Sequence, residues 1–408
     1  INNWEGGLLN SKNCFLIKKM KNKKLLMIPG PIEFDSKVIS AMGVQTPSHT
    51  ELSFIESFGN CLRLMKKVWL APGGQPFIVS GSGTLAMDMA IANLVEPGDK
   101  VLVISTGYFG ERFKDISIRY GANVTLLTAP IGEVVSLEDI EDELKNKDYK
   151  LLTITHVDTS TAVLVNPKPI ADLAKKYEVL SILDGICSVA GEEIKQDDWG
   201  LDVIITASQK AIGVPPGLAL VVVSQKALNV WKKRKTLVLN YYSDWGNWLP
   251  IMKAYEEGYP AYFGTPPVNL ILALETSLKI ILSEGMLNRI KRHQKLASAF
   301  RLAVFSLGLK LLPINTGIAA NTLSAIYYPD NTDGGLFCSK MADNNVIIAG
   351  GLHPEIKSYY FRVGHMGSVS ETDLITTLNA LELSLHAINY NIDLGISLNT
   401  FKKEMSCY

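Results

Sequence analysis

The chain has 408 residues, with 40 Lys and Arg against 40 Asp and Glu, and 47% of its residues are apolar. This length can bury a sizeable core and indicates two or three domains, or one large α/β domain with a smaller companion. The balanced charge argues against a general nucleic-acid binder, and the longest uncharged stretch, Ala211–Gln225, is too short and too rich in Pro and Gly to span a membrane.

Seven short apolar runs alternate with amphipathic stretches in the first half of the chain. This alternation predicts a parallel sheet covered by helices. The runs are Phe77–Val79, Val101–Ile104, Val124–Leu127, Leu151–Ile154, Val179–Leu183, Val203–Ile205 and Leu218–Val223. We therefore expect an α/β fold with one large, mostly parallel, seven-stranded sheet.

The stretch from Trp231 to Pro267 is rich in aromatic residues and interrupted by Gly and Pro. We expect it to be irregular and to pack against another surface, with a subunit interface and a substrate lid as the two alternatives. Beyond it, the spacing of apolar residues predicts long helices over Val268–Ser283 and Met286–Leu307.

The C-terminal part of the chain predicts a smaller α+β domain. Its expected strands lie near Leu323–Tyr327, Val346–Ala349 and Tyr359–Val363, and its expected helix runs from Thr372 to Ile388. We accordingly divide the chain into an N-terminal extension without ordered structure (1–24), a large domain (25–283) and a small C-terminal domain (284–408).

A glycine-rich turn, Ser80–Thr84, lies between the first apolar run and a predicted helix over Leu85–Leu94. Backbone N–H groups at such a turn, together with the N-terminus of the helix, can bind a phosphate. With Ala86 the turn also fits the Gly-x-Gly-x-x-Ala pattern of nicotinamide dinucleotide-binding proteins. That interpretation requires an acidic residue at the end of the next strand, where the chain has Ser105–Gly107 instead, and it is therefore disfavoured.

Two charged residues occupy strand ends that should be buried. Asp184 directly follows Val179–Leu183, where a carboxylate needs a cation or a strong donor as its partner. A helix cap or an Asx turn is the alternative for this residue. Lys210 follows Val203–Ile205 and precedes the uncharged stretch, and such surroundings lower the pKa of an amine and make it a nucleophile. A structural ion pair is the alternative here.

These three features restrict the cofactor when they are taken together. Because ligands bind at the carboxyl ends of strands in open α/β sheets, we expect the glycine turn, Asp184 and Lys210 to face one site. A phosphate cradle, a carboxylate and a nucleophilic amine match the ester phosphate, the ring nitrogen and the aldehyde of pyridoxal 5'-phosphate. The sequence therefore predicts a pyridoxal-phosphate enzyme.

Six segments of the chain resemble those of class V aminotransferases. They are Ile28–Pro31, Ser80–Thr84, Thr155–Thr161, Ala207–Gly213, Tyr262–Pro267 and Phe361–Gly367. The resemblance is strongest to the alanine–glyoxylate aminotransferases, a serine–pyruvate aminotransferase-like group, and especially to those of fungal type. It implies a fold-type-I pyridoxal-phosphate transferase that is a homodimer with active sites at the subunit interface.

The resemblance also implies roles for individual residues. Lys210 would form the internal aldimine with the cofactor, and Asp184 would keep the pyridine nitrogen protonated. The residues implied to hold the phosphate are Ser82, Gly83, Thr84 and Gln209, together with Tyr262 and Thr265 of the neighbouring subunit.

Four further residues complete the implied site. Phe109 takes the place of an aromatic residue that stacks on the ring, which is Trp in mammalian relatives, and Thr159 would lie near the ring hydroxyl. Arg362 would bind the substrate carboxylate, and the residue types support this, because only 8 of the 40 basic residues are Arg and a guanidinium fork fits a carboxylate. A structural bridge to an acid is the alternative. Gly30 would bring backbone close to the substrate, or would only form a rigid turn.

The implied reaction is a ping-pong transfer of the amino group of L-alanine to glyoxylate, which gives pyruvate and glycine. Serine–glyoxylate or serine–pyruvate transamination would use equally small substrates. Within the same fold, a phosphoserine aminotransferase stays open, whereas Phe109 and Gln209 stand where cysteine desulfurases place His. From other classes, a nicotinamide dehydrogenase and a catalytically silent binding protein are the alternatives.

The remaining thiols and histidines are expected to be structural. The five cysteines are scattered and show no Cys-x-x-Cys spacing, so we expect reduced thiols and no metal site. Reduced thiols favour an intracellular compartment, and Ser406–Tyr408 differs from a Ser-Lys-Leu peroxisomal signal. We therefore expect a cytoplasmic protein, while a mitochondrial or peroxisomal location stays open.

Overall fold

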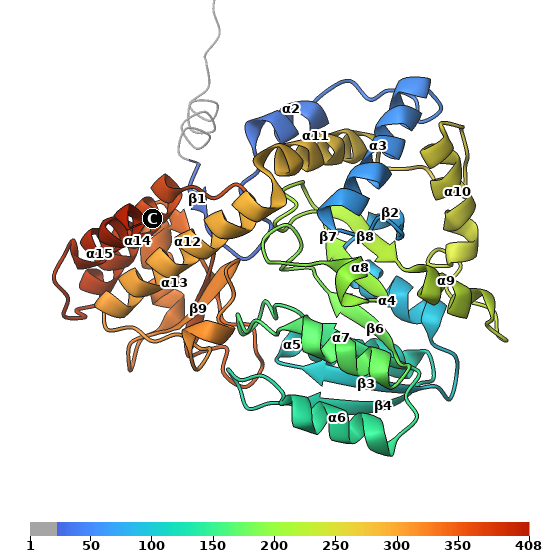
Figure 1. The fold of residues 1–408 in the computed structure, drawn as a ribbon. Helices are drawn as coiled ribbons and strands as arrows, with labels where there is room; N and C mark the ends of the chain where they lie inside the picture. The colour runs from blue at the N-terminus through green and yellow to red at the C-terminus, as the bar shows by residue number, and fades with distance from the viewer. Residues whose placement is uncertain (1–22, 408) are drawn as a thin grey trace, which may run out of the picture.

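The structure, a computed structural model, describes residues 23–407 of the chain. The predicted extension therefore lies almost entirely outside the described residues. The described strands form a seven-stranded, a three-stranded and a two-stranded sheet. Figure 1 shows the C-terminal elements, in orange and red, beside the large sheet and its helices. No helix among residues 23–407 is both long and apolar enough to cross a membrane.

All seven predicted strands of the large sheet form. They are β2 (Gln75–Gly81), β3 (Lys100–Ser105), β4 (Asn123–Thr128), β5 (Leu151–Thr155), β6 (Leu180–Asp184), β7 (Val203–Ala207) and β8 (Gly217–Val223). Their spatial order is β2-β8-β7-β6-β5-β3-β4, and every neighbouring pair is parallel except those that involve β8. The prediction of a mostly parallel seven-stranded sheet is confirmed.

Strand β8 determines which strand ends meet. It is antiparallel to both of its neighbours, β2 and β7, so β2 runs in the same direction as the five parallel strands. The carboxyl ends of β2, β3, β5, β6 and β7 consequently lie at one edge of the sheet. This edge is where open α/β sheets bind ligands.

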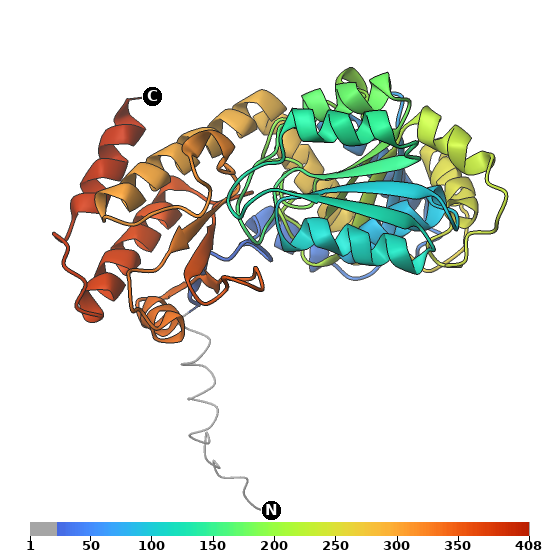
Figure 2. The same ribbon diagram turned by 90° about the horizontal axis from the view of Figure 1, so that it is seen from below.

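Helices cover both faces of the sheet, as Figure 2 shows from below. They are α2 (Ser36–Met42), α3 (Leu52–Val68), α4 (Gly83–Leu94), α5 (Tyr108–Arg119), α6 (Leu137–Asn146), α7 (Pro167–Lys176), α8 (Gln196–Trp199), α9 (Gln225–Lys232), α10 (Trp245–Glu257) and α11 (Val268–Glu284). The central strands read as continuous apolar runs because both of their faces are buried against these helices.

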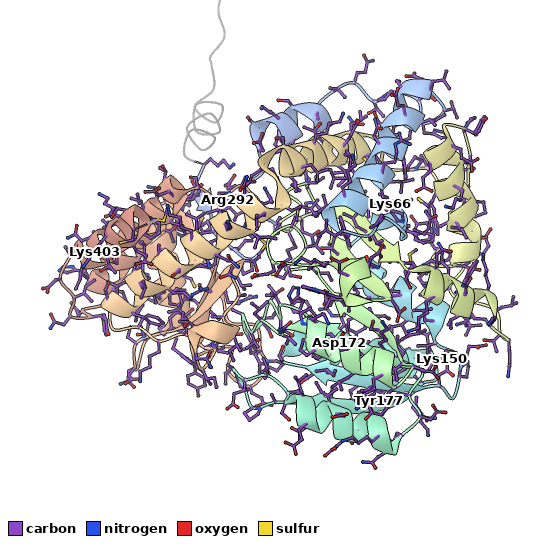
Figure 3. The ribbon with its side chains drawn as sticks, in the orientation of Figure 1. Lys66, Lys150, Asp172, Tyr177, Arg292 and Lys403 are labelled. Carbon is purple, nitrogen blue, oxygen red and sulfur yellow. The ribbon has the colours of Figure 1, made fainter. Side chains whose placement is uncertain are left out.

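Helix α10 corrects the expectation that the aromatic stretch is irregular throughout. Asp244 caps the helix by accepting a hydrogen bond from Gly246 N (2.8 Å), and Gly258 ends it with φ +84°. The ring of Tyr255 stacks on Phe58 at 4.4 Å between centroids. Lys66 on α3, labelled in Figure 3, pairs with Glu256 at 2.8 Å. The aromatic residues therefore bury one face of a regular helix.

The C-terminal part contains a second core around a small antiparallel sheet. Its elements are α12 (Met286–Ser306), a 3₁₀ turn (Thr316–Ile318), β9 (Leu323–Tyr327), α13 (Gly334–Asp343), β10 (Val346–Ile347), β11 (Ala349–Gly350), β12 (Tyr360–Gly364), α14 (Glu371–Ala387) and α15 (Ile396–Ser406). The three-stranded sheet has the order β11-β12-β9, and the predicted smaller α+β part is confirmed as a fold. The strand predicted near residues 346–349 is split into β10 and β11.

The first described residues join this second core. Strand β1 (Leu25–Leu26) pairs with β10, Met27 is fully buried in the C-terminal core, and Gly364 N donates to Met27 O (2.8 Å). At the junction of α11 and α12, Arg292, labelled in Figure 3, donates to the Glu284 carboxylate (2.7 Å). The division of the chain at residues 24/25 and 283/284 stays a prediction.

Candidate active site

The structure brings most of the predicted site residues to the carboxyl edge of the large sheet. Ser82, Gly83 and Thr84 follow β2, Phe109 follows β3, Thr159 follows β5, Asp184 ends β6, and Gln209 and Lys210 follow β7. Residues that are up to 128 positions apart in the chain therefore share one edge, because their strands run in the same direction.

The turn Ser80–Thr84 presents polar groups that the fold leaves available. Ser82 is the N-cap of α4, but its side chain makes no capping hydrogen bond. The first bond of the helix runs from Ala86 N to Ser82 O (3.2 Å), so the preceding N–H groups have no partner within the helix. A Cβ added at Gly83 would lie 2.6 Å from Ile186 Cδ1. The turn can thus receive an anion, and a side chain at position 83 would have to displace Ile186.

Lys210 is held against the N-terminal segment of the described chain. Its side chain is buried, and Nζ donates a hydrogen bond to Pro29 O. Gly30, with φ +123°, allows this approach, since an added Cβ would lie 2.6 Å from Lys210 Cδ and 2.8 Å from Nζ. Burial lowers the pKa of Lys210, and the positive charge of Arg362 lowers it further. The neutral, nucleophilic amine is favoured, and Lys210 makes no ion pair within residues 23–407.

Asp184 keeps one carboxylate oxygen without a partner. Oδ1 accepts from Ile186 N (2.9 Å), which is the Asx turn considered above, while Oδ2 accepts no hydrogen bond from the described part of the chain. Burial raises the pKa of Asp184 to about 7; the charge of Asp158 adds to this rise, and Ile186 N, Arg112 and Lys210 oppose it. A bound group that presents a cationic N–H would satisfy the open oxygen.

Asp158 is a site residue that the sequence analysis missed. It is fully buried, and its Oδ2 accepts from Phe109 N (2.9 Å) and Gly110 N (3.2 Å). Its Oδ1 accepts from Ser160 N (2.8 Å) and Ser160 Oγ (2.5 Å). Asp158 therefore ties the segment of Phe109 to the segment of Thr159. The available signal resembled that of Asp184: Asp158 is a carboxylate three residues after the end of the buried strand β5.

Arg362 reaches the large sheet from β12. Nε donates to Gly350 O (2.9 Å) and Nη1 donates to Thr159 O (3.0 Å). Its partners are carbonyl groups, so the alternative of a structural bridge to an acid does not occur among the described residues. Nη2 makes no hydrogen bond in residues 23–407, which leaves one side of the guanidinium available for a carboxylate.

Arg112, on α5, is a second residue that the sequence analysis did not assign. Its Nη1 donates to Thr84 Oγ1 (3.0 Å), and its guanidinium lies 4.8 Å from the ring centroid of Phe109. Such a cation over an aromatic ring stabilises both side chains. Arg112 therefore links the glycine turn to Phe109. Its position one helical turn after Phe109, in a chain with few Arg residues, was the available signal.

Three residues predicted to bind phosphate show no link to the glycine turn within the chain. Gln209 Oε1 is buried without a hydrogen-bond partner. Tyr262 is 65% exposed; its hydroxyl lies 3.4 Å from Thr265 Oγ1, and its ring lies 5.8 Å from that of His49. In the described part of the chain, neither Tyr262 nor Thr265 forms a hydrogen bond to residues 80–84.

The histidines and the thiol near the site behave as structural groups. His156 Nδ1 lies 2.9 Å from Ser188 Oγ, and burial lowers the pKa of His156 to about 3. Burial likewise lowers the pKa of His365 to about 3 and raises that of Cys187. All three side chains are uncharged at neutral pH, in agreement with the structural roles expected for them.

Comparison with protein families identifies the family of the chain. The family model of the class V aminotransferases matches residues 41–314, which is more than half of the chain. The chain belongs to the class V aminotransferases. Since this family depends on pyridoxal phosphate, the predicted cofactor and fold type are confirmed, and the family match replaces the nicotinamide dehydrogenase alternative.

Several relatives of this class V aminotransferase act on glyoxylate. It is 39% identical over 363 residues to alanine–glyoxylate aminotransferase 1 of Saccharomyces cerevisiae, which covers 85% of this chain and 93% of the yeast protein. It is 31% identical over 377 residues to a serine–glyoxylate aminotransferase of Arabidopsis thaliana, with 91% and 92% covered. A crystal structure of an alanine–glyoxylate aminotransferase from Nostoc sp. superposes with a TM-score of 0.84 at 33% identity, over 89% of this chain and 95% of that one.

The residues present in this class V aminotransferase fit pyridoxal phosphate. The open N–H groups and the Ser82 hydroxyl suit a phosphate, and the unpartnered Oδ2 of Asp184 suits a protonated ring nitrogen. Lys210 supplies a buried amine with a lowered pKa for the aldehyde. The glycine turn, Asp184 and Lys210 thus match the phosphate, the ring nitrogen and the aldehyde of the cofactor.

Proposed function

We propose that this aminotransferase moves the amino group of L-alanine to glyoxylate and releases pyruvate and glycine. The observation that carries the proposal is Arg362, whose guanidinium is fixed by two carbonyl groups and keeps Nη2 for one substrate carboxylate. Alanine and glyoxylate each offer a single carboxylate. The yeast relative, at 39% identity, acts on this pair by name.

The cofactor is held by the groups that the fold leaves open. Ser82, Gly83, Thr84 and Gln209 would hold the phosphate, Phe109 would stack on the ring, and Thr159 would lie near the ring hydroxyl, since all of them follow strands that end at one edge of the sheet. Arg112 holds Thr84 and Phe109 in place through its hydrogen bond and its contact with the ring. When bound, pyridoxal phosphate supplies an aldehyde that condenses with amines and a ring that accepts electrons.

The chain's own residues move the protons. Lys210, once its amine is free, takes the proton from the substrate Cα and later returns one; burial lowers the pKa of this amine and so favours the neutral form that accepts a proton. Asp184 holds a proton on the ring nitrogen through its open oxygen. Arg362 orients the substrate by its carboxylate. Gly30 lets the backbone lie against the Lys210 side chain, which a Cβ at this position would displace.

We also propose that the active unit is a homodimer. Tyr262 and Thr265 are exposed and are not linked to their own glycine turn, which suits residues that reach the phosphate of a second subunit. Exposed apolar side chains in the same region, Leu237 (86%) and Leu239 (80%), suit a surface covered by that subunit.

A half-reaction experiment tests the donor and the acceptor. The absorbance of the bound aldehyde cofactor should disappear when alanine is added and return when glyoxylate follows. A panel of donors that includes serine, aspartate and phosphoserine is run under the same conditions. A faster loss of absorbance with serine would favour the serine–glyoxylate alternative, for which the Arabidopsis relative provides a precedent. If none of these donors changes the spectrum, the proposed function is wrong.

A further inference from the structure

Tyr360 lies next to the proposed carboxylate-binding residue in the fold. It is fully buried in β12, two positions before Arg362, so both side chains leave the same face of the strand. Its hydroxyl donates to Ser160 O (2.5 Å) and accepts from Leu352 N (2.8 Å) and His353 N (2.9 Å). The phenol therefore uses its full hydrogen-bonding capacity on backbone groups.

Tyr360 and Arg362 connect the same two loops. One loop follows β5 and supplies the carbonyl groups of Thr159 and Ser160; the other follows β11. Gly350, the last residue of β11, accepts from Arg362, while Leu352 and His353 in the loop that follows it donate to Tyr360. Each side chain therefore bonds to the segment after β5 and to the chain at or just after the end of β11, so the position of the guanidinium depends on segments that the phenol holds together.

We propose that Tyr360 is a positioning residue that fixes Arg362 for the substrate carboxylate. Without the phenol hydroxyl, the buried Ser160 carbonyl and His353 N–H and the half-buried Leu352 N–H lose their partner, and the loops separate or rearrange until these groups are satisfied. Gly350 O and Thr159 O then move, and the guanidinium loses the two bonds that orient it. Substrate binding weakens, while Lys210 and Asp184 on the large sheet stay in place.

The test compares Tyr360→Phe with Tyr359→Phe in the cofactor-loaded enzyme. Tyr359 is the neighbouring residue, 63% exposed, and its hydroxyl makes no hydrogen bond in the described chain, so it is a matched control. This inference rests on the proposed function for its substrates. We expect Y360F to raise the KM of both alanine and glyoxylate roughly tenfold, with kcat within about twofold, and Y359F to change neither.

Binding of propionate gives a readout that does not depend on turnover. Propionate has the carboxylate but no amino group, and a ligand that binds only the folded state stabilises it by RT ln(1 + [L]/Kd), so at a fixed concentration weaker binding gives a smaller rise of the unfolding temperature. We expect this rise in the wild type and in Y359F, and its loss in Y360F. Reaction of the bound cofactor with hydroxylamine, which has no carboxylate, should proceed at the wild-type rate in all three proteins.

A second variant protects the test if Y360F is too unstable to measure. Gly351→Ala would place a Cβ 2.7 Å from the ring atom Cε1 of Tyr360, and so displaces the second loop while the phenol remains. It should raise the same two KM values. Wild-type KM values and wild-type propionate binding in Y360F would overturn the inference. Failure of alanine to change the wild-type spectrum would instead overturn the proposed function.

Discussion

The proposed site has two sides: one is formed by buried residues of the chain itself, and the other is an exposed segment that lacks contacts to the glycine turn. On one side, Asp158, Tyr360 and Arg362 are buried and bonded to backbone groups, and Lys210 is buried against Pro29. On the other side, the segment that contains Tyr262 is exposed and makes no hydrogen bond to the glycine turn. The buried side is preorganised by the fold, whereas the exposed side depends on a second surface.

The largest expected effect concerns the buried side. Lys210→Ala should reduce turnover by at least ~1,000-fold, because the nucleophile and the proton carrier are both lost. Steady-state assays with alanine and glyoxylate measure the loss. The control is Lys168→Ala, which removes an exposed amine paired with Asp172 at 2.5 Å on α7 and should leave turnover unchanged. Wild-type turnover in K210A would refute the assignment of the buried side.

Mixed dimers test whether the exposed side comes from a second subunit. K210A is combined with a Tyr262→Ala/Thr265→Ala double variant, each of which should show low activity alone. If the two sides of a site come from different chains, each mixed dimer contains one intact site, and random mixing restores roughly a quarter of wild-type activity. Activity is measured before and after exchange of subunits. No recovery, in a preparation shown to contain mixed dimers, would place both sides in one chain.

The pH dependence of stability gives the smallest expected effect. Because the pKa of Asp184 is raised to about 7 in the cofactor-free fold, the folded state holds one more proton than the unfolded state between about pH 4 and pH 7. This contribution makes the free energy of unfolding fall as the pH rises, by at most about 1.4 kcal/mol per pH unit.

Asp184→Asn isolates this contribution from other buried groups. Burial also raises the pKa of Glu192 to about 7, whereas it lowers that of His156, so only the difference between wild type and D184N is informative. Urea unfolding of the cofactor-free proteins at several pH values measures it. We expect the free energy of unfolding of D184N, relative to that of the wild type, to increase as the pH rises towards 7. If the free energies of unfolding of the two proteins change with pH in the same way, Asp184 is not desolvated, in contradiction to the structure.

The residues of the candidate site that could be predicted from the sequence are charged residues next to apolar strands. The strands were predictable because apolar runs buried on two faces have few alternatives. Asp184 and Lys210 were predictable because a charged side chain at the end of a buried strand is unfavourable unless a partner or a function accounts for it. Helix α10 was not, since Pro250 and the flanking glycines resemble loop residues.

The missed residues act through backbone groups that are distant in sequence. The Tyr360 hydroxyl meets Ser160 O across 200 positions, and Asp158 meets Phe109 N across 49. A carbonyl or an N–H group leaves no mark in a residue pattern, so neither partner could be inferred before the fold was known. The proposed contacts of Tyr262 lie beyond the single chain and stay predictions.

The route of the first described residues has a practical consequence for engineering. Within a few peptide units the backbone leaves the small sheet at Leu26, supplies the carbonyl of Pro29 to the Lys210 amine and reaches Gly30, where an added Cβ would lie 2.6 Å from Lys210 Cδ. An insertion between Leu26 and Pro29 would therefore alter the hydrogen-bond acceptor of that amine, so engineered sequences should leave this segment intact.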